Sequence, residues 1–337
     1  MLKTVEMEFQ FSPTIAKPPA TPKQLYDRAC SNDQITVNSW RPVWLKQFKE
    51  NHDRFGSFKN RGIGKLLNRF KNQPVIVAGS GPSLKTNIND LKDTKGIPIV
   101  SCLHNYQYFE DNGVYPEFYC TLDAGAVTIE EVSEGGKEKP EFYWESTKNK
   151  KLLAYIGSSP ELIAKWQGEV FWFTAPIPDG EIMETMQAVE PFYSYVSSGG
   201  NVLGASFYIA KAVMGANPTI FVGADFSFSY THKFHAWDSK YDASLGNVML
   251  CTDVFGNRVK TWQSYYGFKC WFESTFCKVP GIYINATEGG ILGAYPEGNI
   301  EQIKQMALDD VIKMYSLTEI VAEQFTQPDK KHNLTLF

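Results

Sequence analysis

The sequence lacks the long apolar run that a membrane-spanning helix requires. No stretch of its 337 residues approaches the roughly 20 consecutive apolar residues of such a helix. The first residues, Met-Leu-Lys-Thr-Val-Glu-Met-Glu, also lack the apolar core of a signal peptide. We therefore expect no insertion into a membrane and a cytoplasmic location.

Basic tracts and closely paired cysteines are also missing. The formal net charge is −4, and lysine and arginine are scattered along the chain, which disfavours nucleic acid as a partner. The six cysteines are widely spread and form no Cys-x-x-Cys pair. This is typical of reduced thiols in a cytosolic protein, so we expect neither a zinc site nor a disulfide framework.

From residue 74 onward the chain alternates short apolar strands with helical segments. Alternation of this kind predicts an α/β fold that is Rossmann-like, with a mostly parallel sheet and helices on both faces. An aromatic content of 14% is enough to fill a substantial core. The predicted strands are 75–78, 97–102, 117–122, 152–156, 170–174 and 219–223, and the clearest helices are 84–91, 161–166 and 201–214.

The pattern divides the chain into three parts. Residues 1–70 form an N-terminal arm with several prolines, followed by a helical pattern over 43–70, and they are expected to dock onto the core or onto a partner subunit of a homo-oligomer. Residues 71–297 form the Rossmann-like nucleotide-binding domain, with a lid at about 226–267 that contains a hairpin turn at 255–257. Residues 298–337 form a C-terminal helix, from about 299 to 324, and a tail.

A glycine-rich turn follows the first predicted strand. Its residues are Gly79, Ser80, Gly81, Pro82 and Ser83. The glycines allow a tight turn and a close approach to a ligand, and a helix beginning at this point offers free N–H groups to a phosphate. The alternative is an ordinary turn between a strand and a helix, because a single turn of this kind is weak evidence.

Polar residues follow other predicted strands, at the edge of the sheet where open parallel sheets bind ligands. His104 and Asn105 come after the second strand and Asp123 after the third, and Asn105 and Asp123 are suited to hold a base or sugar hydroxyls. Capping of local turns is the alternative for such side chains. A second turn of small residues, Ser197, Ser198, Gly199, Gly200 and Asn201, precedes an apolar helix and offers further anion-binding groups.

The predicted lid carries candidates for acid–base chemistry. Asp225 ends the sixth strand, and His232 and His235 follow it. Histidine suits a general base for an acceptor hydroxyl, since its ordinary pKa of roughly 6.5 lets it exchange a proton near neutral pH. Tyr230 and Tyr241 flank the two histidines and are candidate hydrogen-bond donors to a leaving phosphate. A metal shared by the histidines is a weaker alternative, because no third ligand is evident.

Several segments together carry a resemblance to known families. Residues 75–85, Val-Ile-Val-Ala-Gly-Ser-Gly-Pro-Ser-Leu-Lys, and 104–111, His-Asn-Tyr-Gln-Tyr-Phe-Glu-Asp, resemble the nucleotide-binding half of bacterial sialyltransferases that use CMP-activated sugars. Together with Asp123 and the segments 197–201, 222–226 and 284–290, they make residues 45–320 similar to the central domain of motility-associated factor (Maf) flagellin glycosyltransferases. That domain belongs to the MptE-like family, named for an archaeal 6-hydroxymethylpterin diphosphokinase. The segment Asn-Ala-Thr-Glu-Gly-Gly, 285–290, favours the glycosyltransferase branch.

The resemblance implies roles for the two turns and the histidines. Gly79, Ser80, Gly81 and Asn105 would contact the nucleotide, residues 197–201 its phosphate and base, and His232 or His235 would be the general base. Ser80 departs from the pattern, because the sialyltransferases have asparagine there, so its hydrogen bonding to the nucleotide must differ.

Three functions compete at this stage. The first is a sialyltransferase-like transfer of a nonulosonic-acid-type sugar from a CMP-sugar donor to a hydroxyl on a protein or glycan, which requires no metal cofactor. The second is a pterin diphosphokinase that uses ATP and magnesium, with Asp123 and Asp225 as metal ligands. The third is a binding or structural protein that keeps the fold without turnover.

Overall fold

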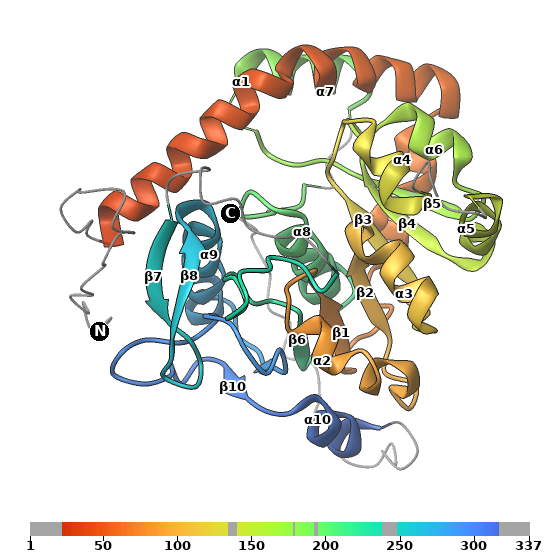
Figure 1. The fold of residues 1–337 in the computed structure, drawn as a ribbon. Coiled ribbons are helices and arrows are strands. Elements are labelled where there is room, and N and C mark those ends of the chain that lie inside the picture. The colour runs from red at the N-terminus through yellow and green to blue at the C-terminus, as the bar shows by residue number, and fades with distance from the viewer. Residues whose placement is uncertain (1–21, 134–139, 178, 192–194, 238–247, 317–337) are drawn as a thin grey trace, which may run out of the picture.

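A computed structural model describes residues 22–133, 140–177, 179–191, 195–237 and 248–316 (Figure 1). Tyr241, the middle of the predicted lid, most of the proline-containing arm and the predicted tail lie outside the described residues.

The centre of the molecule is a parallel sheet, which confirms the predicted fold class. In the described part of the chain it has eight strands in the order β10-β9-β6-β1-β2-β3-β4-β5. The strands are β1 Val75–Ala78, β2 Ile99–Cys102, β3 Phe118–Thr121, β4 Lys151–Tyr155, β5 Glu169–Phe173, β6 Thr219–Val222, β9 Tyr283–Asn285 and β10 Lys304–Gln305. The first six match the predicted strands, whereas β9 and β10 were not predicted because each is too short to show a pattern. Every residue of β1, β2, β3 and β6 is buried, since helices cover both faces.

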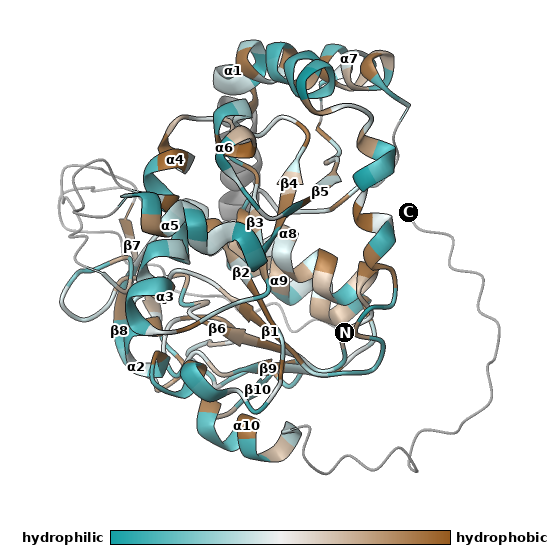
Figure 2. Ribbon diagram, turned by 90° about the vertical axis from the view of Figure 1, so that its right-hand side faces the viewer, coloured by the Kyte–Doolittle hydropathy of each residue, from teal (hydrophilic) through white to brown (hydrophobic). Residues whose placement is uncertain are grey.

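Helices lie on the two faces of this sheet (Figure 2). The described helices that follow the N-terminal one are α2 Leu84–Asn87, α3 Tyr106–Asn112, α4 Val127–Val132, α5 Pro140–Ser146, α6 Pro160–Lys165, α7 Gly180–Val189, α8 Val202–Tyr208, α9 Gln263–Lys278 and α10 Leu308–Tyr315. The predicted helix at 201–214 is α8 continued by a π-helical turn over Ile209–Val213. The predicted helix at 84–91 is the single turn α2, followed by a 3-10 turn over Asp90–Asp93.

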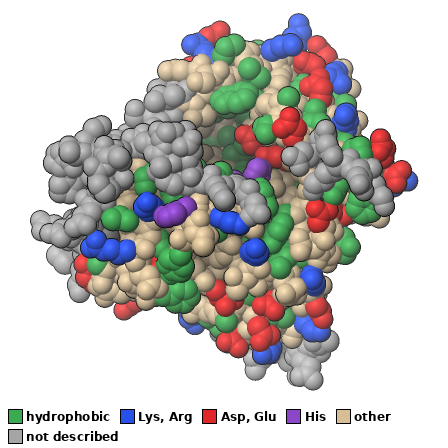
Figure 3. All heavy atoms as spheres, viewed as in Figure 1, with side chains coloured by type: hydrophobic (Ala, Val, Ile, Leu, Met, Phe, Trp, Pro, Cys, Tyr) green, Lys and Arg blue, Asp and Glu red, His purple; other side chains and the backbone are tan. Residues whose placement is uncertain are grey.

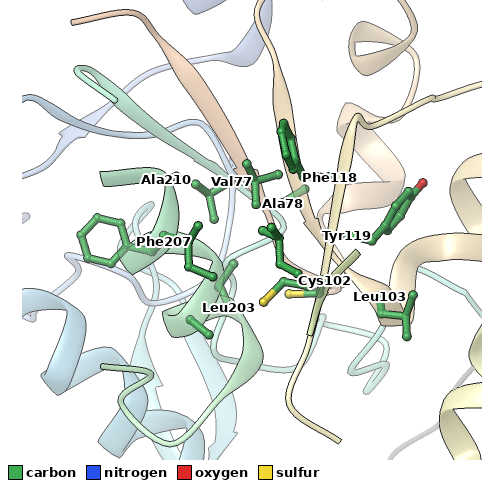
Figure 4. Close-up of a cluster of buried hydrophobic side chains, with 14 of the residues drawn as sticks. Val77, Ala78, Cys102, Leu103, Phe118, Tyr119, Leu203, Phe207 and Ala210 are labelled. Carbon is green, nitrogen blue, oxygen red and sulfur yellow. The ribbon is translucent and has the colours of Figure 1, made fainter. Parts of the chain in front are cut away.

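Helix α8 carries much of the core on its side of the sheet. Its Leu203, together with Ala210, faces Val77 of β1 and Cys102 of β2 (Figure 4), whereas Phe207 packs on Phe221 of β6 and Phe272 of α9. Full burial of each large apolar side chain contributes about 1.5–3 kcal/mol to stability. This packing fixes the start of α8 beside the carboxyl ends of β1 and β2.

The N-terminal helix α1, Pro22–Phe55, docks on the core of its own chain. In Figure 1 it crosses the top of the molecule from the region of α9 to α7, and it contacts both helices. The Gln47 side chain donates to the carbonyl of Ala124 (2.9 Å), and Asn51 donates to the carbonyls of Ile156 and Ser158. No helix in the described ranges, this long one included, is apolar enough over sufficient length to cross a membrane.

The helical pattern predicted over 43–70 ends earlier than expected, at Phe55. Gly56 has a left-handed φ of 77°, and its N–H bonds to the His52 carbonyl, which is the usual way a glycine terminates an α-helix. Two 3-10 turns, Phe58–Arg61 and Ile63–Leu66, follow.

The predicted C-terminal helix over 299–324 is wrong in its first part. Residues Lys304 and Gln305 form β10, which pairs with β9, so the sheet continues past the expected domain boundary at 297. The helical pattern is realised in α10 alone, within the described residues. Backbone hydrogen bonds from Ile300 to Gly293 and from Met306 to Asn285 hold this segment extended against the sheet.

The hairpin predicted inside the lid is confirmed. Strands β7, Val248–Thr252, and β8, Arg258–Trp262, pair in antiparallel fashion around the turn at 255–257. This two-stranded sheet lies beside α9 (Figure 1).

Candidate functional site

A cavity of about 310 Å³, the strand-end cavity, lies at the carboxyl ends of β1, β2, β3 and β6. The sequence-predicted residues that line it are Gly79, Ser80, Gly81, His104, Asp123, Asn201, Asp225 and His235. The space-filling view shows a hollow in this face, with acidic and hydrophobic side chains around it and a histidine side chain beside it (Figure 3). The topology thus brings residues from distant parts of the chain to one edge of the sheet, as expected for an open parallel sheet.

The glycine-rich turn is interlocked with the end of β6. A Cβ at Gly79 would lie 2.5 Å from the Gly223 carbonyl oxygen, and one at Gly81 would overlap the Asp225 carboxylate. The N–H groups of Gly79 and Gly81 donate to the carbonyls of Val222 and Gly223. The two glycines therefore permit a close approach between two loops of the protein itself.

Asp225 is tied to Ser83 at this junction. The Ser83 N–H donates to Asp225 Oδ1 (3.1 Å) and its hydroxyl to Oδ2 (2.7 Å). Burial raises the Asp225 pKa to about 7, while the two bonds from Ser83 act in the opposite direction. The Ser83 amide is thus engaged, and α2 is too short for a strong helix dipole. The Ser80 N–H has no hydrogen-bond acceptor among the described residues and remains available to an anion.

Asn105 supports the glycine-rich turn from inside the protein. It is fully buried, and its Nδ2 donates to the Gly79 carbonyl (2.9 Å) and to the Ser101 hydroxyl (3.1 Å). Its Oδ1 has no partner in the described part of the chain. Asn105 is absent from the wall of the strand-end cavity, so it holds the turn in place in this structure.

His235 lies in the strand-end cavity with one ring nitrogen open. Its Nδ1 lies 3.2 Å from the Ser80 carbonyl oxygen, and because a carbonyl only accepts, Nδ1 carries the hydrogen and Nε2 is left as an acceptor. The ring stacks on Trp237 at 4.9 Å. Burial, and then the nearby His104, lower the His235 pKa to about 4, so this imidazole is neutral at pH 7.

His104 lies beside His235 and is oriented by a carboxylate. The two ring centroids are 4.6 Å apart, and His104 Nδ1 donates to Glu131 Oε1 over 2.8 Å. The other nitrogen, Nε2, is buried without a partner among the described residues. Nothing in the sequence pattern marked Glu131, because it projects from α4, well after the strand end that precedes it.

Asp123 is the fourth titratable side chain here, beside His104, His235 and Glu131. Crowding by protein atoms and the Glu131 carboxylate raise its pKa to about 6, although the side chain still reaches solvent; His104 acts in the opposite direction. Two imidazoles and two carboxylates therefore meet at one end of the strand-end cavity.

Two residues predicted in the lid lie outside the strand-end cavity. His232 is exposed, with a left-handed φ of 62°, and Tyr230 bonds through its hydroxyl to Asp253 on the hairpin. Tyr265, at the start of α9, lines the cavity instead. Burial, and then Asp225, raise the Tyr265 pKa to about 12, and its hydroxyl has no partner in the described ranges, so it is a hydrogen-bond donor at neutral pH. No local motif marked Tyr265, which lies in one of several aromatic clusters of the sequence.

The second turn caps α8. Asn201 Oδ1 accepts from the Gly204 N–H (2.8 Å), and Ser198 Oγ accepts from the Gly200 N–H (3.3 Å). Gly199 and Gly200 both have left-handed φ angles, and a Cβ at Gly199 would overlap the Trp271 ring. Ser197 lines neither cavity described here.

A second cavity of about 270 Å³, the aromatic cavity, adjoins the first. The two share Asp123, Asn201 and Val202 as lining residues. Ser198 and Gly200 of the second turn also line the aromatic cavity, and helix α1 contributes Trp40 and Trp44 to its wall.

The Asn-Ala-Thr-Glu-Gly-Gly segment supports the Asp225 loop. The Thr287 hydroxyl accepts from the Ala224 N–H (3.1 Å), and a Cβ at Gly290 would overlap the Asp225 backbone. Glu288 accepts from Asn87 (2.8 Å) and from the Leu308 N–H (3.0 Å). This motif acts through the position of Asp225.

Asp123 and Asp225, expected as magnesium ligands under the diphosphokinase hypothesis, both line the strand-end cavity. Both Asp225 oxygens accept hydrogen bonds from Ser83. Within the described residues, no three His, Cys, Asp or Glu side chains converge in a way that could hold a metal ion.

Comparison with known proteins identifies the family. The family model described as 6-hydroxymethylpterin diphosphokinase MptE-like matches residues 46–231, more than half of the chain, and the chain therefore belongs to the MptE-like family. The fold is similar to that of a Maf glycosyltransferase from Magnetospirillum magneticum AMB-1, with a TM-score of 0.54 and 15% sequence identity. The similarity covers 77% of this chain and 40% of that chain. A search of curated proteins found no match.

Proposed function

We propose that this MptE-like chain is a glycosyltransferase that moves a nonulosonic-acid-type sugar from a CMP-sugar donor to a hydroxyl on a protein or glycan. The fold shared with a Maf glycosyltransferase supports the reaction class. The observation that carries the proposal is the strand-end cavity, which combines histidine acceptors with the hydrogen-bond donors Ser80 N–H and Tyr265 hydroxyl. Sugar transfer requires both, a base for the acceptor and donors for the departing phosphate.

In this proposal His104 is the proton acceptor. Its Nε2 takes the proton of the acceptor hydroxyl, and the Glu131 carboxylate at Nδ1 stabilises the imidazolium that forms. The acceptor oxygen forms the new glycosidic bond as the bond between the sugar and the CMP phosphate breaks. CMP leaves with the electron pair, and Ser80 N–H and the Tyr265 hydroxyl donate to its phosphate.

His235, one of the two histidines that the family resemblance offers as the base, has a different environment from that of His104. Its ring donates to a carbonyl, and burial disfavours its charged form. We assign His235 the role of a neutral hydrogen-bond acceptor for a hydroxyl of the bound substrates. It becomes the proton acceptor in place of His104 if its substitution has the larger effect on transfer.

The description of the family favours a second candidate, a pterin diphosphokinase. That reaction passes diphosphate from ATP to a pterin alcohol and uses magnesium. Asp123 and Asp225 would be its metal ligands, and Asp225 would bind the metal while it accepts hydrogen bonds from Ser83.

Calorimetric titration with CMP, CDP, UDP and ATP separates the candidates. The proposal expects binding of the cytidine nucleotides and release of CMP from a CMP-activated nonulosonic acid in the presence of EDTA. Magnesium-dependent formation of AMP from ATP and 6-hydroxymethylpterin would establish the diphosphokinase instead. A chain that binds none of the four nucleotides fits a binding or structural protein.

A further inference from the structure

The aromatic cavity is walled by rings from two distant parts of the chain. Trp40 and Trp44 come from α1, and Tyr155 from the end of β4. Two polar atoms of these residues, Trp44 Nε1 and the Tyr155 hydroxyl, are buried without a hydrogen-bond partner among the described residues and expose no surface to the cavity. The polar side chains Ser198 and Asn201 also line the cavity. Aromatic rings beside such polar groups suit a ligand that has both apolar faces and hydrogen-bonding groups.

The charge of the cavity narrows the ligand further. Asp123 is the charged residue among the described residues of its wall, which include no lysine or arginine. A phosphate or a sugar carboxylate would therefore meet a carboxylate without a compensating cation, and it would lack the Ser80 N–H and the Tyr265 hydroxyl that the strand-end cavity offers to an anion. A neutral sugar ring fits better, because its C–H faces pack on indole rings and its hydroxyls accept from the Ser198 hydroxyl and donate to Asp123.

The cavity wall is held firmly by the fold. Trp44 packs edge-on against Tyr155, with ring centroids 6.1 Å apart, and Gly157 lacks a Cβ where Trp44 and Phe48 come within 2.9 Å. Asn51, three residues after Phe48 on α1, anchors the helix to the carbonyls of Ile156 and Ser158. The family match begins at residue 46, so both tryptophans precede the region that the family shares.

We propose that the aromatic cavity binds a neutral sugar of a glycan acceptor, with Trp40 and Trp44 packing on the ring. The cavity meets the strand-end cavity at Asp123 and Asn201, so a hydroxyl of the bound sugar at this boundary faces the histidine pair. The acceptor role rests on the proposed glycosyltransferase function. The binding of a neutral sugar does not, and it can be measured independently.

Saturation-transfer NMR with the full chain and a panel of methyl glycosides of neutral hexoses and N-acetylhexosamines tests the binding. We expect at least one glycoside to bind, with affinity roughly tenfold weaker in Trp40→Ala and unchanged in Tyr155→Phe, because the Tyr155 hydroxyl has no surface open to the cavity. Trp144→Ala is the matched control, because Trp144 is also half-buried but lies on α5, away from the cavity. Its sugar affinity should equal that of the parent chain.

CMP titration of the same proteins separates the two proposals. Unchanged CMP affinity in Trp40→Ala and Tyr155→Phe is expected. An equal loss of CMP affinity would mean that the cavity holds the nucleobase, and it would overturn the inference, as would the absence of any sugar binding or equal binding by all variants. Sugar binding without CMP binding would instead reject the proposed donor while leaving the sugar site in place.

Discussion

The strand-end cavity and the aromatic cavity adjoin one another but differ in origin and chemistry. The first is built from the ends of four strands and from the loops that follow, and it contains imidazoles and carboxylates. The second is walled by tryptophans from α1 and by Tyr155, and the described residues give it one carboxylate, Asp123. Groups that exchange protons are thus separated from groups that pack against a ring. The difference suggests a division between reaction and recognition.

The largest expected effect on this division comes from replacing a histidine of the strand-end cavity. His104→Ala removes the proposed proton acceptor, and we expect sugar transfer to slow by about 10²- to 10⁴-fold while CMP affinity is unchanged. Single-turnover release of CMP measures the rate, and calorimetry measures the affinity. Glu131→Gln should also slow sugar transfer, by a smaller factor than His104→Ala.

His232→Ala is the control for that experiment. His232 is exposed and lines neither cavity, so its removal should leave transfer unchanged. Full activity in both His104→Ala and His235→Ala would contradict the assignment of reaction chemistry to the strand-end cavity.

A methyl group at Gly81 tests the packing beneath the strand-end cavity. The new Cβ in Gly81→Ala overlaps the Asp225 carboxylate, and we expect the free energy of unfolding to fall by about 1–3 kcal/mol, as for other overpacked sites. Urea unfolding measures the change. Gly64→Ala is the control, because a Cβ there meets no atom within 4 Å. Equal stability of the two variants would show that the interlock of the two loops is loose.

The anchor of α1 allows the aromatic cavity to be disturbed alone. Asn51→Ala leaves two carbonyls without their donor, at a cost of about 1–3 kcal/mol in unfolding free energy. Sugar affinity should fall with it, since α1 carries the tryptophans, whereas CMP affinity should stay constant. Lys49→Ala on the exposed side of the same helix should change neither affinity. A parallel loss of CMP affinity in Asn51→Ala would mean that the two cavities act as one site.

The smallest expected effect is a pH dependence. His235 has a folded-state pKa lowered to about 4 from an ordinary 6.5, so its contribution to stability is present above pH 6.5 and is lost as the pH falls toward 4. With allowance for its partial exposure, we expect the parent chain to lose on the order of 1–2 kcal/mol more than His235→Ala over this range. Urea unfolding of both proteins at pH 7, 5.5 and 4.5 gives the difference in unfolding free energy between them. The raised pKa values of Asp123 and Asp225 change stability in the opposite direction, but they do so in both proteins and therefore cancel in this difference. Identical slopes would mean that His235 titrates normally.

The sheet and much of the strand-end cavity followed from the sequence. Apolar runs such as 75–78 and 219–222 predict strands because both faces of the sheet are covered, and the carboxyl ends of parallel strands must then meet. The same logic brought His104, Asp123 and Asp225 to one edge. Reasoning from the sequence could not distinguish a glycine that faces a ligand from Gly81, which faces Asp225. In both cases the position must lack a Cβ atom.

The aromatic cavity could not be predicted. Trp40 and Tyr155 are separated by more than one hundred residues, and only the docking of α1 brings their surroundings together. Tyr265 and Glu131 were missed for a related reason, since a helix can present a side chain to a cavity without any local motif. The predicted helix over 299–324 failed where backbone pairing with β9 overrode an apolar periodicity.

The release of CMP from a CMP-activated nonulosonic acid, in the presence of a neutral glycan acceptor and EDTA, tests the central claim most directly. The account predicts CMP release and a glycosylated acceptor from the parent chain, and a loss of both in His104→Ala. No CMP release by the parent chain, together with magnesium-dependent AMP formation from ATP and 6-hydroxymethylpterin, would contradict it.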